Sequence, residues 1–104
     1  MRSTLMVALA LAGLTAATPA SADMALARKN GCMSCHAVNM KLVGPAYADV
    51  AKKYKGDSKA PAMLATKIQK GGKGVWGPMM MPPHPNLSNA DALKLANWIL
   101  GGAK

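Results

Sequence analysis

The stretch Cys32-Met33-Ser34-Cys35-His36 decides the fold, because two thiols three residues apart are followed directly by an imidazole. Thiols at this spacing can reach the two vinyl groups of one porphyrin, and the histidine that follows is then placed to ligate the iron from one face. The motif therefore predicts one covalently attached c-type haem.

Three other uses of a Cys-x-x-Cys pair fit the rest of the chain less well. A thioredoxin-like redox pair expects a preceding strand and a longer alternation of strands and helices, and neither pattern is present. A structural zinc site needs a second pair of ligands, and His84 is the only other histidine. A disulfide across so short a loop contributes little stability.

The chain has 104 residues, which is room for one domain. Its first part has the features of a secretory signal: basic Arg2, an apolar run from Leu5 to Leu14, and the small residues Ala20-Ser21-Ala22 before a cleavage point. The run is too short for a membrane span, which needs roughly 20 residues. We expect residues 1–22 to be a removed signal peptide, and residues 23–104 to be an exported, soluble domain.

The chain is strongly basic, with a formal charge of +9, or +8 without Arg2. This charge favours an acidic partner, but it does not indicate nucleic acid, because Phe is absent and the basic residues are scattered without a nucleic-acid-reading motif. Residues 23–104 contain only four aromatic side chains. A core so thin is expected to need an added element, and a haem would supply it.

Glycine and proline divide the domain into four short helices, and no strand pattern is visible, so we predict an all-α fold. Helices are expected over residues 24–29, from Pro45 to Tyr54, and from Pro61 to the Gly71-Gly72 pair. The last begins after Ser88, which resembles a cap with Asp91 three residues on, and carries a stripe of Leu93, Ala96 and Leu100.

Residues 71–87 form a long loop rich in glycine and proline that contains the candidates for a sixth iron ligand: Met79, Met80, Met81 and His84. Methionine commonly fills gaps in cores. Three consecutive methionines share no face of a helix or strand, however, so a ligand loop explains them better. The prolines around them hold the chain in a fixed path that suits the presentation of one thioether.

Three segments together resemble the small bacterial class I cytochromes c of the cytochrome c-551 type. They are the haem motif, Gly44-Pro45, and the stretch Gly74-Val75-Trp76-Gly77-Pro78-Met79-Met80-Met81-Pro82-Pro83, in this order and at these spacings. The likeness covers essentially all of residues 23–104. It implies a cytochrome c domain of about four short helices wrapped around one haem.

The resemblance also implies roles for individual residues. Cys32 and Cys35 would form the thioethers, and His36 would be the proximal ligand. Met81, which directly precedes the paired prolines, would be the axial methionine. Pro45 would accept a hydrogen bond from the other imidazole nitrogen of His36.

The resemblance places three further residues around the haem or its ligand. Trp76 would donate its indole N–H to a haem propionate, with ordinary core packing as the alternative. Lys67 stands where the family often has Arg or His facing the inner propionate. His84 stands where the family often has an amide near the methionine sulfur, and we expect it to be exposed, with a hydrogen bond to the ligand region or iron ligation as alternatives. Trp98 is expected to pack between the first and last helices.

A haem iron with both axial positions filled indicates a one-electron carrier, and not an enzyme. We expect a monomeric periplasmic protein that binds acidic redox proteins of the respiratory chain (membrane cytochrome complexes, a terminal oxidase, a nitrite reductase or a peroxidase), and neither nucleic acid nor the membrane interior. Basic residues near the haem edge would guide docking, or else serve only solubility: Lys29, Lys41, Lys70, Lys73 and Lys94. The alternative function is a ligand-binding or peroxidase-like haem protein with an open distal face.

Overall fold

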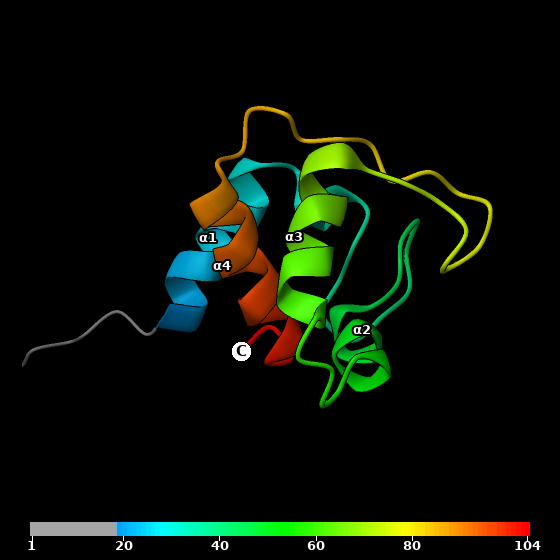
Figure 1. Cartoon of the computed structure of the whole chain (residues 1–104), viewed down its shortest axis with the longest axis horizontal. Helices are drawn as coiled ribbons and strands as arrows, with labels where there is room; N and C mark the ends of the chain where they lie inside the picture. Colours follow the sequence, from blue (N-terminus) through cyan, green and yellow to red (C-terminus); the bar gives the residue numbers. More distant parts are fainter. Residues whose placement is uncertain (1–18) are drawn as a thin grey trace, which may run out of the picture.

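The computed structural model describes residues 19–104, and within them it contains four α-helices and no β-strand. Helix α1 spans Pro19–Lys29, α2 spans Tyr47–Lys53, α3 spans Ala60–Lys70 and α4 spans Asn89–Leu100. A single turn of 3-10 helix, η1, spans Cys32–Ser34. Figure 1 shows α4 alongside α1 and α3, with α2 below α3. The predicted all-α class is confirmed.

Helix α4 is the centre of the core, because it packs against α3, α2 and α1. Its buried face carries Ala92, Leu95, Ala96 and Ile99, which recur at the i, i+3, i+4, i+7 spacing of one helix stripe. Of the expected stripe, Ala96 lies in this buried row and Leu100 is half-buried against the core, but the prediction for Leu93 is wrong. Leu93 is 41% exposed, since it lies one position away from the buried row.

The start of α4 is confirmed, because the Ser88 Oγ atom accepts a hydrogen bond of 3.1 Å from the Asp91 backbone N–H. This contact satisfies one of the donors that a helix start leaves open. Trp98 is buried, and its ring meets Tyr47 of α2 edge-on with 5.5 Å between centroids. The indole of Trp98 thus contacts α2, and it belongs to the same buried cluster as Ala27 of α1.

Two helices begin elsewhere than predicted. Helix α2 begins at Tyr47 because Pro45 and Ala46 stay extended ahead of it, Ala46 with φ −61° and ψ 140°. Helix α1 already includes Pro19, so the predicted cleavage point after Ala22 falls within it. Residues 1–18 of the predicted signal peptide lie outside the described residues. None of the helices within residues 19–104 is long and apolar enough to cross a bilayer.

The segment between α3 and α4 is the loop that the sequence singled out. It leaves the C-terminal end of α3, extends away from the helices, and returns across the end of α3 to reach α4 (Figure 1). Its two arms meet at one antiparallel pair, Gly72 with Met81. The loop therefore forms one wall of the space beside the helices.

Candidate functional site

The Cys-x-x-Cys-His motif folds into a tight turn directly after α1. Gly31 takes a left-handed conformation, with φ 75°, and the η1 turn follows. The backbone N–H of His36 donates to the Cys32 carbonyl at 3.0 Å. Both cysteines are free and half-buried. One short turn thus displays two thiols and an imidazole.

The chemistry of Cys32 differs from that of a redox-active thiol. Burial raises the pKa of the Cys32 thiol above its ordinary value, although a hydrogen bond with Tyr47 opposes the shift. Redox-active Cys-x-x-Cys pairs instead have a lowered thiol pKa. A zinc site is also unsupported, since no group of three or more His, Cys, Asp or Glu side chains in residues 19–104 could hold a metal ion.

The His36 imidazole is held from two sides. Its Nδ1–H donates to the Pro45 carbonyl at 2.8 Å, and its ring stacks on Tyr47 with 5.0 Å between centroids. Gly44 lies so close that an added Cβ atom would overlap the imidazole. Because Nδ1 is the donor, Nε2 is left with its lone pair for a metal.

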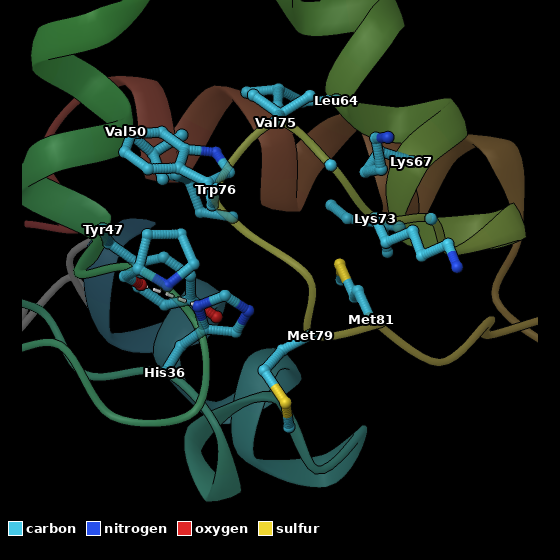
Figure 2. A pocket seen from close by; sticks show the side chains of 15 residues that line it. His36, Tyr47, Val50, Leu64, Lys67, Lys73, Val75, Trp76, Met79 and Met81 are labelled. Carbon is cyan, nitrogen blue, oxygen red and sulfur yellow. Dashed lines mark hydrogen bonds between the residues drawn. The ribbon is translucent and has the colours of Figure 1, made fainter.

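Met81 is the methionine that the fold fixes in place. Its backbone N–H donates to the Gly72 carbonyl at 2.8 Å, and its carbonyl accepts from the Gly72 N–H at 3.1 Å. Met81 is half-buried, whereas Met79 and Met80 are 64% and 63% exposed. Figure 2 shows the Met81 sulfur turned into the cavity, with Met79 at its margin.

Between His36 and Met81 lies a largely apolar cavity with about 740 Å³ of empty space, part of which is open to solvent. Val50, Leu64 and Ile68 contribute to its walls. The cavity has a nitrogen ligand at one wall and a thioether at another, next to two free thiols, so the residues present fit a covalently held haem.

Lys67 and Trp76 both line this cavity, as Figure 2 shows. The Lys67 ammonium reaches the loop, since a Cβ atom on Gly72 would lie only 2.7 Å from it. Trp76 is 41% exposed, and the Lys53 ammonium lies 5.6 Å from the centre of its ring. Trp76 is therefore a wall of the cavity, and ordinary core packing does not describe it.

The expectation that His84 is exposed is wrong. His84 is half-buried, and its two ring nitrogens lie 3.1 Å from the Ile68 carbonyl oxygen and 3.2 Å from the Asn30 carbonyl oxygen. The flanking prolines favoured a solvated loop, but the loop turns back over α3 and brings His84 against the helix end. No sequence pattern marks that return.

Sequence reasoning also missed Tyr47, Lys53 and Gly72 as parts of the site. Tyr47 supports the imidazole, Lys53 lies over Trp76, and Gly72 pairs with Met81. The position of Tyr47 two residues after Pro45 was the one available signal. Lys53 and Gly72 act through tertiary contacts that local patterns do not encode.

Comparison with known proteins connects this site to a family. The sequence profile of the cytochrome c family matches residues 24–103. A cytochrome c-552 of Hydrogenobacter thermophilus is 52% identical over 101 residues, which cover 96% of this chain and 97% of that protein. A cytochrome c-551 of Allochromatium vinosum is 47% identical over 93 residues, which cover 89% of this chain and 99% of that protein. The crystal structure of Nitrosomonas europaea cytochrome c552 superimposes with a TM-score of 0.73 at 51% identity, covering 75% of this chain and 96% of that one.

Proposed function

The chain belongs to the cytochrome c family and carries one covalently attached haem c, and from this we propose that it is a periplasmic one-electron carrier that binds acidic redox proteins and is not an enzyme. When bound, the haem iron supplies the chemistry by passing between its ferrous and ferric states. The protein's own residues hold the group, close its two faces and shape the surface for docking.

One observation carries the proposal: the two sides of the cavity present one imidazole and one thioether. We assign Cys32 and Cys35 to the covalent attachment, and His36 and Met81 to the iron. The His36 Nδ1–H bond to Pro45 fixes the orientation of the imidazole. With His36 and Met81 both bound to the iron, no position would be left for a substrate, and the group would supply one-electron transfer alone.

We assign Trp76 and Lys67 to the haem propionates. Lys67 is a cation at the cavity wall, so it favours the ionised form of a carboxylate beside it. Replacing Lys67 by Gln should therefore shift the pH range in which the reduction potential changes to higher pH. Lys70→Gln is the matched control, because Lys70 belongs to the same helix turn and does not line the cavity. Equal pH profiles of the potential in both variants would contradict this assignment.

The docking surface that we propose is basic. Of the five lysines named above, Lys73 lines the cavity. Lys94 instead lies 3.8 Å from the Asp23 carboxylate, an ion pair that connects α4 with α1. We therefore place Lys73 at the haem edge and leave Lys94 out of the docking set. We propose that the carrier is a monomer with neither a nucleic-acid nor a membrane-inserted partner.

Export remains a proposal for the N-terminal part. We propose that residues 1–22 are removed as a signal peptide and that residues 23–104 form the cytochrome c domain. The mass of the holoprotein recovered from a periplasmic extract tests this. A chain that begins at Asp23 is expected, and a haem-loaded chain that keeps Met1 would contradict it.

The functional test compares electron transfer with peroxide chemistry on the purified holoprotein. A redox titration followed by absorbance should show one reversible one-electron step. Hydrogen peroxide with a reducing dye should give no turnover, because the cavity offers Met81 and no acid–base pair beside the iron. Rapid peroxide turnover by a ferric form that lacks the sulfur-to-iron charge-transfer band would instead establish the open-faced alternative.

A further inference from the structure

The imidazole of His84 lies where three segments meet. Its Nδ1 atom is 3.1 Å from the carbonyl oxygen of Ile68, in the last turn of α3. Its Nε2 atom is 3.2 Å from the carbonyl oxygen of Asn30, the residue directly after α1. The loop that carries Met81 passes across the end of α3 here (Figure 1). One side chain thus joins this loop to two helix ends.

Both partners of the ring are carbonyl oxygens, which only accept hydrogen bonds. Both contacts can be hydrogen bonds at the same time only when both ring nitrogens donate, and only the doubly protonated imidazolium carries two N–H groups. In the neutral ring one nitrogen turns a lone pair toward a carbonyl oxygen, and that bond is lost.

The backbone of His84 also attaches the loop to α3. Pro82, Pro83 and Pro85 have no N–H groups, while the His84 N–H donates to the Gln69 carbonyl at 3.0 Å. In the part of the chain that the structure describes, every hydrogen bond from residues 82–86 to α3 or to the end of α1 comes from His84. The segment directly after Met81 depends on this one latch.

We propose that His84, in its doubly protonated form, is a positioning residue for Met81: it latches the loop to the ends of α3 and α1 and so keeps the thioether turned into the cavity. This inference rests on the proposed role of Met81 as an iron ligand. When His84 loses one proton, the latch loses one hydrogen bond, and the Met81 sulfur leaves the iron more often.

The other charged side chains around His84 would not give the same dependence on pH. The helices and the loop around His84 carry two carboxylates, Asp23 in α1, which pairs with Lys94, and Asp91 in the first turn of α4. Their other charged side chains are basic: Arg28 and Lys29 at the end of α1, Lys67 and Lys70 at the end of α3, Lys73 in the loop and Lys94 in α4. Lysine and arginine side chains keep their charge in mildly acidic to neutral solution. The haem propionates assigned to Lys67 and Trp76 are the same in every His84 variant, so a difference in pH profile between the variants reports on His84. His84 and His36 are the only histidines of the chain, and His36 is assigned to the iron.

The experiment measures how often Met81 leaves the ferric iron of the holoprotein. At saturating cyanide the binding rate is limited by the departure of the methionine sulfur, and it is recorded from mildly acidic to weakly basic pH, where cyanide stays protonated. In the natural protein the rate should rise by about tenfold with increasing pH, as expected for the loss of one charge-assisted hydrogen bond. His84→Ala should be fast at every pH. His84→Gln should lack most of the natural pH dependence and be slower than His84→Ala, because its amide offers two N–H donors without titrating.

Gln69→Ala is the matched control. The Gln69 amide also donates two hydrogen bonds from α3, to the Leu87 carbonyl at 3.1 Å and to the Asn89 side chain at 2.7 Å, but it does not titrate. This variant should unfold more easily and keep the natural pH profile. A His84→Gln protein that retains the pH dependence of the natural protein would overturn the inference, as would a Gln69→Ala protein that loses it. If the natural ferric protein lacks the sulfur-to-iron band, the assignment of Met81 fails instead.

Discussion

At the scale of single residues, Met81 differs from its two neighbours by what holds its backbone. Two hydrogen bonds to Gly72 fix Met81, whereas Met79 and Met80 are mostly exposed. Met81→Ala should therefore abolish the weak sulfur-to-ferric charge-transfer band and open the iron to cyanide or carbon monoxide. Met79→Ala and Met80→Ala are the controls, and both should keep the band. Loss of the band in Met80→Ala alone would move the ligand by one position.

Gly44 is the residue that leaves room for the proximal imidazole. A Cβ atom there would overlap the His36 ring, although the φ angle of Gly44 is not positive. Gly44→Ala should therefore displace the imidazole and alter the Soret spectrum and the reduction potential. Gly31→Ala is the control, because Gly31 has φ 75° and no atom within 4 Å of the added Cβ. It should lower the free energy of unfolding by about 1–2 kcal/mol and leave the spectrum unchanged.

At the scale of elements, the sequence predicted those helix starts and buried faces that depend on neighbouring residues in the chain. The helices at Pro61 and after Ser88 follow from proline and cap positions, and Leu64 and Ile68 are buried as their spacing predicted. The start of α2 was missed because Pro45 lies outside the helix, where its carbonyl accepts a hydrogen bond from the His36 ring, and Ala46 is extended after it. The contact between Pro45 and His36 was available only through the family resemblance.

The N-terminal cap of α4 should contribute measurably to the stability of the protein. Removing the Ser88 hydroxyl leaves the Asp91 N–H without its partner, so Ser88→Ala should lower the free energy of unfolding of the holoprotein by about 1 kcal/mol. Ser58→Ala is the control, because Ser58 is an exposed loop residue and makes no side-chain hydrogen bond within the described residues. Denaturant titration distinguishes the two. An equal loss in both variants would show that the cap contributes nothing.

At the scale of the whole molecule, the sequence predicted the composition of the site better than its arrangement. Cysteine spacing predicts the cofactor, and the proline-bounded methionines predict where a second iron ligand is to be sought, whereas the choice of Met81 among them came from the family resemblance. The positions of Lys53, Gly72 and His84 depend on how the loop between α3 and α4 returns over the helices. That path is decided by contacts between residues far apart in the chain, such as His84 and Asn30. The hydrophobic pattern of the sequence does not reveal such contacts.

The net charge is also a property of the whole molecule, and it predicts how the carrier meets its partner. A formal charge of +8 on residues 23–104 should steer encounters with an acidic redox protein. Such steering acts over about one Debye length, about 10 Å at 0.1 M salt, so the bimolecular electron-transfer rate should fall steeply as ionic strength rises. Lys73→Glu should slow transfer more than Lys104→Glu, because Lys73 lines the cavity and Lys104 is the exposed C-terminal residue. Lys29→Glu tests the side next to the haem motif, and all three variants should keep the natural spectrum. A rate that responds neither to salt nor to Lys73→Glu and Lys29→Glu would mean that docking is apolar and that the lysines serve solubility.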